Sequence, residues 1–389
     1  MRVTYYYPWS FFYPVNSGAA AVAMQHMEYF RNRGLKVRVA IRTDATDAEQ
    51  LIFERNFGWL DDLCVLNSRH RPEIHRALNA YTFSDYLTAH AAIGELPDFR
   101  KFISADVDLL FFNYIFSAPF LDVAPRHAAR VVESVDVMSK QFLLGRHAPL
   151  QLARDLKVEC ELYNLFDRVL MISRAEAEFM QARSSANIEY VPRGVERLPA
   201  GAMLEENGDV YDLLFVGCPH PPNVEGVHWF YEHIFLPHLK PHGLRWAIAG
   251  TIDERLELAD ESVHVLGRVD DLDALYRRSK VVIVPIFNGA GISIKTLEGL
   301  SRGKPVVATP VGARGLPECD QSMFKICFQS EKAEVVRRIL ELTRSPQLRN
   351  EYGRKALEYV DSHFGRQNYY LHMDRLLMPL LDRNRRLCA

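Results

Sequence analysis

The sequence predicts an α/β protein with two halves, each a parallel sheet covered by helices on both faces. Short apolar, β-branched runs alternate with amphipathic segments, as they do when a crossover helix follows each strand. The chain has 389 residues, and above roughly 250–300 residues a single core tends to split into domains. A polar, glycine-containing stretch, Leu198 to Asp212, separates two groups of strand-like runs and is typical of a linker.

The expected strands lie on either side of that linker. In the first half they are Val3–Tyr7, Val37–Ile41, Leu109–Phe116, Arg130–Val135 and Val169–Ile172. In the second half they are Leu213–Val216, Arg245–Ala249, Val263–Leu266, Val281–Pro285 and Val306–Ala308. The apolar spacing of Tyr369, Leu371, Met373, Leu376, Leu377 and Leu380 predicts a terminal helix. The expected domains are therefore residues 1–197 and 213–364, with the linker at 198–212 and the terminal helix at 365–389.

Composition describes a globular protein with no affinity for nucleic acid. Apolar residues make up 48% and charged residues 25%, and the formal net charge is −2. The cysteines are scattered and form no C-x-x-C pair, so neither a disulfide framework nor a zinc site is indicated. The N-terminus lacks the pattern of a signal peptide, and no uncharged apolar run is long enough to span a membrane. We expect a cytoplasmic protein whose membrane contact, if any, is peripheral at the inner face.

The most informative segment runs from Val281 to Gly315 and predicts a strand, a glycine-rich turn, a short helix and a strand. Ser293 can cap the helix. Lys295 then falls in its first turn, where the helix dipole disfavours a cation by roughly 0.3–1 kcal/mol, so an anion is expected opposite it. Glu298 follows on the same face. Backbone amides, a lysine and then a carboxylate suit a nucleotide diphosphate followed by its ribose hydroxyls.

Two other strings mimic ligand sites. Asp106 and Asp108 form an Asp-x-Asp pair, but they precede the expected strand and so lie at the wrong end of it for a metal ligand. The segment Gly299 to Lys304 resembles a P-loop but lacks its spacing and its Ser/Thr, so Gly303 is interpreted as a helix C-cap. No metal site is predicted.

The Val281–Gly315 block resembles the donor-site signature of family 4 (group 1) glycosyltransferases, which have the GT-B fold. Further segments match the family in order: Phe166 to Glu176, Val191 to Val195, Leu213 to Phe230 with its Pro222-Asn223 pair, and Leu266 to Leu272. The resemblance implies two Rossmann-like domains facing a central cleft, an acceptor-binding first domain and a donor-binding second domain. It also implies that the terminal helix crosses back to the first domain.

By this resemblance, Lys295 is a catalytic and diphosphate-binding residue, and Glu298 binds the ribose. The expected donor-binding set is Gly217, His220, Arg268, Gly289, Ala290, Gly291, Ile292, Ser293, Lys295 and Glu298. The chain departs from the pattern in two places. Many relatives carry a glutamate where this chain has Ala290, which leaves the donor hexose and the retaining stereochemistry open. Relatives often place an arginine and a lysine after the first strand of the donor domain, where this chain has His220.

Each of these residues also has a structural interpretation. Arg268 suits phosphate oxygens, but a loop salt bridge to Asp270 or Asp271 is equally compatible with the sequence. His220 can be a neutral surface residue. Gly217 can permit close approach of a ligand or simply form a tight turn.

Asp136 is the candidate on the acceptor side, because it directly follows a predicted strand. It could orient or deprotonate an acceptor hydroxyl, or it could be a helix N-cap. Relatives often have His-Asp here, whereas this chain has Val135; Glu133 is expected to be structural. Trp9, in an aromatic run after the first strand, could stack on an acceptor sugar or a lipid carrier, or pack locally. Gly18 is assigned to the acceptor side with the same two interpretations as Gly217.

The sequence therefore predicts a hexosyltransferase-type enzyme that moves a sugar from a UDP- or GDP-sugar to a hydroxyl of a glycan or glycolipid. Retention of stereochemistry is expected, with no cofactor and no metal. Two alternatives stay open: a sugar-nucleotide epimerase of the same fold, and a non-catalytic nucleotide-sugar-binding protein. A dehydrogenase is disfavoured, since no G-x-G-x-x-G follows either domain's first strand.

Overall fold

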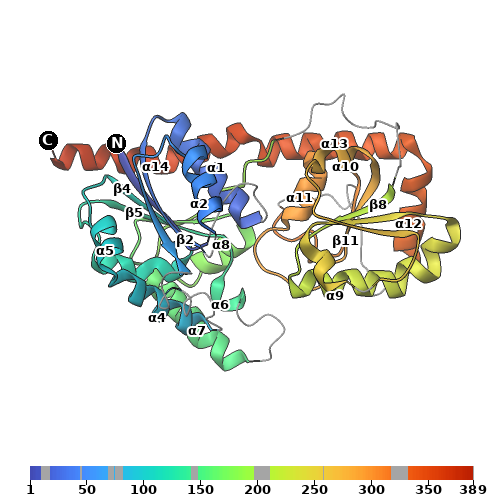
Figure 1. The fold of residues 1–389 in the computed structure, drawn as a ribbon, viewed down its shortest axis with the longest axis horizontal. Helices are drawn as coiled ribbons and strands as arrows, with labels where there is room; N and C mark the ends of the chain where they lie inside the picture. The colour runs from blue at the N-terminus through green and yellow to red at the C-terminus, as the bar shows by residue number, and fades with distance from the viewer. Residues whose placement is uncertain are drawn as a thin grey trace. The chain divides into compact units, whose positions relative to one another are not determined.

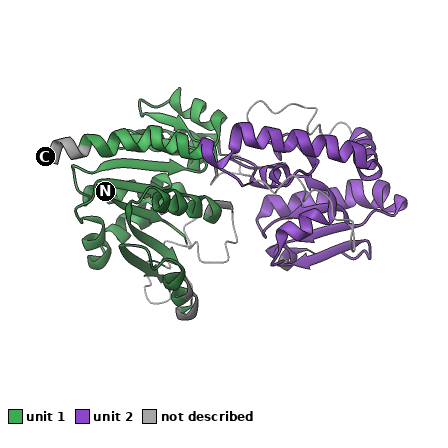
Figure 2. Ribbon diagram, turned by 90° about the horizontal axis from the view of Figure 1, so that it is seen from above, with its two compact units in different colours: residues 1–193, 369–389 green, residues 194–368 purple. Residues whose placement is uncertain are grey.

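The computed structural model describes residues 1–9, 18–43, 46–68, 74, 82–141, 148–196, 211–256, 258–316 and 332–388. The chain divides into two compact units (Figure 2). Unit 1 comprises Met1–Arg193 and Tyr369–Ala389, and unit 2 comprises Gly194–Asn368. Residues 198–210 of the predicted linker lie outside the described residues, and Asp212, predicted as its end, already belongs to a strand.

Unit 1 contains a seven-stranded sheet in the order β3-β2-β1-β4-β5-β6-β7, and all its strand pairs are parallel. The strands are β1 (Arg2–Tyr7), β2 (Lys36–Thr43), β3 (Asp62–Asn67), β4 (Leu109–Asn113), β5 (Ala129–Ser134), β6 (Arg168–Met171) and β7 (Ile188–Tyr190). The strand order reverses between β1 and β4, which is where ligands of such sheets bind, beyond the carboxyl ends of the strands.

The predicted strands of the first half are found, with one correction. The expected strand Leu109–Phe116 ends at Asn113, because Tyr114 has a φ of 68° and a 3₁₀ helix, η2 (Ile115–Asp122), follows it. An aromatic side chain in this backbone region is uncommon and cannot continue a strand. β3 and β7 were not predicted.

Helices cover both faces of the sheet in unit 1 (Figure 1). On one face, Tyr5 meets His26 of α1 (Gly18–Asn32) with ring centroids 5.7 Å apart. On the other, Tyr6 meets His90 of α4 (Phe83–Gly94) at 5.9 Å. The remaining helices of the unit are α2 (Asp47–Asn56), α5 (Pro97–Ile103), α6 (Met138–Gln141), α7 (Pro149–Tyr163) and α8 (Arg174–Gln181).

The predicted terminal helix is present as α14 (Arg366–Cys388), and from Tyr369 onward it is part of unit 1. Asp374 accepts hydrogen bonds from Tyr29 Oη of α1 at 2.9 Å and from Nε of Arg33, the residue after α1, at 2.7 Å. The side chain of Met373 is fully buried. This helix therefore completes the α1 side of the unit.

Glu133 is structural, as predicted. Its carboxylate is buried and pairs with His26 Nε2 at 3.1 Å and with Asn113 Nδ2 at 3.0 Å. His26 Nδ1 in turn lies 3.1 Å from the hydroxyl of Tyr5. Buried polar groups are costly unless they are hydrogen-bonded, so this chain of contacts explains how a carboxylate is tolerated inside the sheet.

Unit 2 contains a five-stranded parallel sheet in the order β10-β9-β8-β11-β12. The strands are β8 (Tyr211–Val216), β9 (Trp246–Ala249), β10 (Val263–Gly267), β11 (Ser279–Val284) and β12 (Val306–Ala308), so every strand predicted for this half is confirmed. The order reverses between β8 and β11.

The two faces of this second sheet are covered by different helices. Phe230, the last residue of α9 (Pro221–Phe230), packs on Trp246 with ring centroids 5.0 Å apart. On the other face, α11 (Ile294–Ser301) lies so close that a Cβ on Gly299 would be 2.9 Å from Val306 Cγ2. The other helices are η4 (Tyr231–Leu239), η5 (Lys240–His242), η6 (Thr251–Arg255), α10 (Leu272–Arg277), α12 (Lys332–Arg344) and α13 (Pro346–Phe364).

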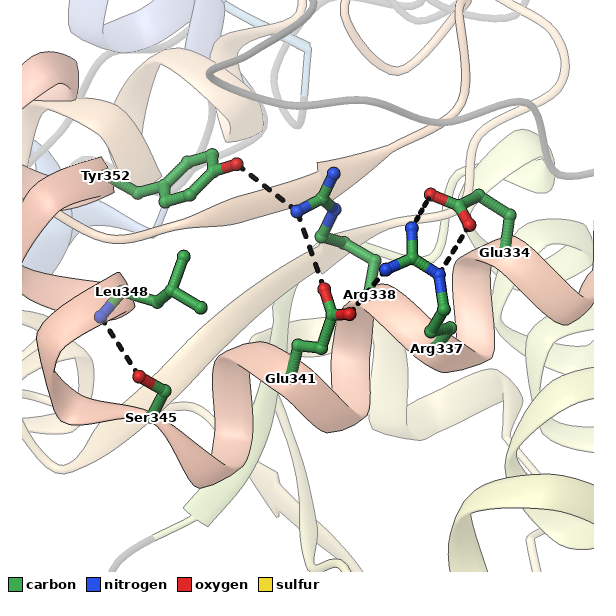
Figure 3. Close-up of polar contacts among 7 residues, drawn as sticks. All are labelled: Glu334, Arg337, Arg338, Glu341, Ser345, Leu348 and Tyr352. Atoms are coloured by element: carbon green, nitrogen blue, oxygen red, sulfur yellow. Dashed lines mark hydrogen bonds and ion pairs between the residues drawn. The ribbon is translucent and has the colours of Figure 1, made fainter.

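Surface ion pairs and a cap define the turn from α12 to α13 (Figure 3). Arg337 pairs with both Glu334 and Glu341 on α12. Ser345 caps α13, because its Oγ accepts a hydrogen bond of 3.2 Å from the amide of Leu348. The exposed pairs contribute only ~0.3–0.5 kcal/mol each, whereas a cap is worth ~1 kcal/mol, so the cap is the stronger determinant of this turn.

Candidate functional site

The site in unit 2 lies where the strand order reverses, at the carboxyl ends of β8 and β11. Gly217 to His220 connect β8 to α9, and residues 285–293 connect β11 to α11. Both connections start at neighbouring strand ends, since Leu213 and Val281 are register partners. The topology therefore brings the predicted donor-binding segments to one edge of the sheet.

Lys295 is the second residue of α11, in the first turn as predicted. It is partly buried, and its ammonium makes no hydrogen bond or ion pair with any described residue. Burial lowers the pKa of Lys295; Arg314 lowers it further, while Cys218 and Glu298 act in the opposite direction. A desolvated cation at a helix N-terminus is stabilised by an anion, so the geometry favours a negatively charged ligand here.

Glu298 lies three residues later on the same helix face, and it is partly exposed. Within the described part of the chain, its carboxylate receives no hydrogen bond. The neighbouring Arg302 pairs instead with Asp273, with Nε 2.8 Å from Oδ1. Glu298 is thus available to accept hydrogen bonds from ligand hydroxyls.

Arg314 is a further cation of this site that sequence reasoning missed. Its Nε donates to the carbonyl oxygen of Ala290 at 2.6 Å, and its Nη1 donates to that of Val311 at 2.9 Å. A Cβ on Gly289 would lie 2.6 Å from the guanidinium carbon, so a larger residue there would displace the Arg314 side chain. The one available signal was a cation in a glycine-rich turn, Gly312 to Gly315, after a predicted strand.

Two details of the predicted Gly289–Ser293 turn need correction. Ser293 occupies the N-cap position, but its hydroxyl pairs with Thr296 Oγ1 at 3.1 Å rather than with a helix amide. Its own amide donates to the carbonyl oxygen of Arg314 at 3.0 Å, so it is not available to a ligand. Gly291 has a φ of 64°, as a turn glycine can. Ile292 is buried.

His220 is the N-cap residue of α9 and lies at the surface. Desolvation by the surrounding protein lowers its pKa, and Lys295 and Arg314 lower it further. These two effects show that His220 shares the electrostatic environment of the two cations. A neutral imidazole here would serve as a hydrogen-bonding group.

Gly217 and Arg268, two further predicted donor-binding residues, have different surroundings in the structure. A Cβ on Gly250, which has a φ of 98°, would lie 2.2 Å from the carbonyl oxygen of Gly217, so this close approach is made by the chain itself. Arg268 is exposed, and within the described residues it forms no ion pair with Asp270 or Asp271, the alternative that the sequence left open. A ligand-binding role for Gly217 or Arg268 stays a prediction.

In unit 1, Asp136 follows β5 and is partly buried. Both interpretations of Asp136, an acceptor-side residue and a helix cap, stay predictions, and Glu159 of α7 is one cap of α6 (Met138–Gln141). The two oxygens of Glu159 accept from the amides of Met138 and Ser139, each at 2.9 Å. Asp136 is held through its backbone, since its carbonyl oxygen accepts from Ser134 Oγ at 2.7 Å.

Tyr114 lies at the carboxyl end of β4, next to the predicted acceptor side, and was also missed. It is buried, and its pKa is raised by burial first and then by Tyr7, Asp136 and Glu133. Trp9 packs on it with ring centroids 4.5 Å apart, so local packing accounts for at least part of the predicted aromatic loop. Residues 10–17 lie outside the description, and Gly18 begins α1.

Asp106 and Asp108 lie before β4, as expected, and both contact protein groups. Asp108 Oδ2 accepts from the amide of Arg2 at 2.7 Å, and Asp106 pairs with His127 at 2.9 Å. Nowhere in the described ranges are three or more His, Cys, Asp or Glu gathered in a metal-binding arrangement. No described helix has the length and apolarity needed to cross a bilayer.

This architecture, two units that each contain a parallel sheet covered by helices, is that of the GT-B fold. Sucrose-phosphate synthase from Thermosynechococcus elongatus superposes with a TM-score of 0.68 at 13% identity, over 98% of this chain and 99% of that one. Anabaena HepE, solved with UDP and glucose, gives 0.65 at 16% identity over 97% and 100%. A TarM mutant of S. aureus, solved with UDP and alpha-GlcNAc-glycerol, gives 0.67 at 11% over 98% and 99%.

Residues 211–345 match the family described as "Glycosyl transferases group 1". A 44.6 kDa Klebsiella pneumoniae protein, named for the cps region, is 27% identical over 173 residues. That match covers 40% of this chain and 42% of the relative's length. The fold is GT-B, as predicted, and the match over residues 211–345 supports the predicted resemblance to the group 1 glycosyltransferases.

Proposed function

We propose that the protein transfers a sugar from a nucleoside diphosphate sugar, a UDP- or GDP-sugar, to a hydroxyl group of a glycan or glycolipid acceptor. The observation that carries the proposal is the pair Lys295 and Arg314 beside the N-terminus of α11. Both cations lie at the switch point of unit 2, and Lys295 has no partner among the described residues. Structural relatives were solved with UDP, which supports a diphosphate ligand.

In this proposal the site stabilises the departing diphosphate. Negative charge develops on its oxygens as the bond between the anomeric carbon of the sugar and the diphosphate breaks and the acceptor oxygen bonds to that carbon. Lys295, Arg314 and the first-turn amides of α11 are already in place and partly desolvated, so they need little reorganisation when that charge appears. Glu298 accepts from the ribose hydroxyls of the same nucleotide. His220 supplies a hydrogen bond in place of the basic pair found in relatives.

Asp136 is the proposed acceptor-side residue of unit 1. Asp136 is partly exposed just after the carboxyl end of β5. It would accept the proton of the attacking hydroxyl, a task that typically contributes ~10²–10⁴-fold to the rate. Tyr114, locked beside it by packing, would shape that pocket.

The donor sugar is recognised differently from relatives that carry a glutamate in the turn. Ala290 is buried and presents no carboxylate, and its carbonyl oxygen is taken by Arg314. We therefore propose that Arg314 orders this turn in place of a sugar-binding acid. Retention of stereochemistry, independence from metal and a peripheral position at the inner membrane face also belong to the proposal.

A nucleotide-sugar thermal-shift screen followed by a turnover assay tests the function. A native-state ligand raises the melting temperature once it exceeds its Kd. A glycosyltransferase stabilised by one nucleotide sugar releases its nucleoside diphosphate only when an acceptor is added. An epimerase changes the donor sugar without an acceptor, and a binding protein leaves it intact over a broad acceptor panel.

A further inference from the structure

Arg42 of β2 is a fully buried cation for which the described residues supply no counter-ion. Its side chain is 0% exposed, and Nε, Nη1 and Nη2 all lack a hydrogen-bond partner among the described residues. The contrast with Arg38, two residues earlier on the same strand, is sharp. Arg38 Nη2 pairs with Asp62 at 2.7 Å, and its Nη1 donates to the carbonyl oxygen of Phe102 at 2.9 Å. Because a guanidinium stays protonated in proteins, Arg42 carries an uncompensated charge inside unit 1.

Two more orphaned polar atoms lie on the same face of the sheet. Tyr6 of β1 is the register partner of Ala40, so Arg42 is its diagonal neighbour on that face. The Tyr6 hydroxyl and His90 Nε2 of α4 are both buried, and neither has a hydrogen-bond partner within the described ranges. The rings of Tyr6 and His90 are 5.9 Å apart, and both residues interact electrostatically with Arg42.

The protonation state of His90 determines whether its Nε2 donates or accepts a hydrogen bond. Its Nδ1 lies 2.8 Å from the carbonyl oxygen of Tyr86, so Nδ1 carries the hydrogen. Burial lowers the pKa of His90 well below its usual value, and Arg42 adds to the effect, so the ring is neutral. Nε2 is then a hydrogen-bond acceptor. The cluster as a whole offers guanidinium and phenol donors together with one acceptor.

We propose that this cluster binds a small monovalent anion inside unit 1, held by the guanidinium of Arg42 and the hydroxyl of Tyr6. An unpaired buried charge is strongly destabilising, whereas an anion at the guanidinium compensates it. Because Arg42 and His90 are fully buried, the ligands that we propose are the small anions chloride, bromide, nitrate and bicarbonate. A water or a protonated oxyanion can in addition donate to Nε2 of His90.

This site is separate from the proposed donor and acceptor residues. Arg42 is the penultimate residue of β2 and Tyr6 that of β1, so the anion would fix the carboxyl ends of these two strands. Its existence does not depend on the proposed sugar transfer. The anion acts as a structural ligand of unit 1.

The test compares small anions with a large one at constant ionic strength. Melting of the full chain is followed while gluconate is replaced by chloride, bromide, nitrate or bicarbonate. We expect a saturable rise in Tm for at least one small anion, roughly 5–10 °C at a hundredfold excess over Kd. Arg42→Met should abolish this rise. Arg38→Met, a matched control on the same strand, should retain it because that guanidinium already has protein partners.

A second measurement holds even if Arg42→Met fails to fold. Crystals of the wild-type chain grown with bromide should show an anomalous peak within hydrogen-bond distance of the Arg42 guanidinium. The proposal is overturned if the wild-type Tm is the same in gluconate and in every small anion and no such peak is seen. It is equally overturned if the anion-dependent rise persists unchanged in Arg42→Met.

Discussion

Arg314 Nε donates a 2.6 Å hydrogen bond to the carbonyl oxygen of Ala290, which ties the turn after β12 to the turn that precedes α11. The same arginine lowers the pKa of both Lys295 and His220. One side chain thus shapes the glycine-rich turn and sets its positive potential. A ligand that neutralises this charge is the simplest reason to keep two cations so close.

Replacing Arg314 tests that relationship. Arg314→Ala should raise the Kd for a nucleoside diphosphate by roughly 10–100-fold, since a hydrogen bond to a charged group contributes about 1.5–3 kcal/mol. Isothermal titration calorimetry measures the change. Arg344→Ala, an exposed arginine at the end of α12, is the control and should leave the Kd as in wild type. Equal affinity of wild type and Arg314→Ala would remove Arg314 from the site.

Lys295 and Glu298 should contact different parts of the nucleotide, the diphosphate and the ribose respectively. Lys295→Met should weaken binding of both pyrophosphate and a nucleoside diphosphate, because both present phosphate oxygens. Glu298→Gln should weaken only the nucleoside diphosphate, because pyrophosphate has no ribose. Competition titrations with the two ligands measure this selectivity. Parallel losses for both ligands in Glu298→Gln would contradict the ribose assignment.

The lowered pKa of Lys295 predicts that ligand affinity and the stability of the ligand-free protein change in opposite directions with pH. Nucleoside diphosphate affinity should fall as pH rises through the alkaline range below 10.5, because Lys295 loses its proton earlier than an ordinary lysine. The stability of the ligand-free protein should rise over the same window, since the unfolded chain binds more protons there than the folded protein. Lys295→Arg should show neither change, because arginine stays protonated. Titrations and melts across this range on both proteins provide the measurement.

Asp136 and Glu159 form a matched pair for the acceptor side. Asp136→Asn should lower turnover by roughly 10²–10⁴-fold with little change in stability, as expected for a general base. Glu159→Gln should lose about 1 kcal/mol of stability with a much smaller effect on rate, because it caps a helix. Steady-state kinetics and denaturant unfolding of both variants decide between the roles. If Asp136→Asn lost stability with little change in turnover, as expected for Glu159→Gln, Asp136 would be excluded as the general base.

Transfer should continue in excess EDTA. Cationic side chains and helix amides are placed to stabilise the leaving diphosphate, so no divalent ion is required in this account. Activity is compared with EDTA alone and with added Mg²⁺ or Mn²⁺. Loss of activity that either ion restores would show that metal chemistry carries the reaction.

Much of the fold was predictable because parallel strands that are buried on both faces have nearly continuous apolar sequences. The Val281–Pro285 run predicts β11 (Ser279–Val284) to within two residues. Strand β7 (Ile188–Tyr190) was missed because it spans three residues, too few for a pattern. β3 (Asp62–Asn67) was missed because polar residues bound its short apolar run. The end of β4 was misplaced because the positive φ of Tyr114 leaves no trace in hydrophobicity.

The candidate site was predictable where it is local in sequence. Lys295 and Glu298 belong to one helix, so their spacing alone places them on one face. Arg314 and Glu159 act on partners more than a dozen residues away, and only the assembled sheet brings them there. The hydroxyl of Ser293 pairs with Thr296 Oγ1 and not with a helix amide, and the sequence alone does not distinguish between these two partners.

A crystal structure with the nucleoside diphosphate that most raises the melting temperature tests the central claim most directly. We predict density for the diphosphate against the first turn of α11, with its oxygens bonded to Lys295 Nζ and the Arg314 guanidinium and the ribose hydroxyls on Glu298. Density for the nucleotide elsewhere, with Lys295 and Glu298 left without ligand contacts, would contradict the account.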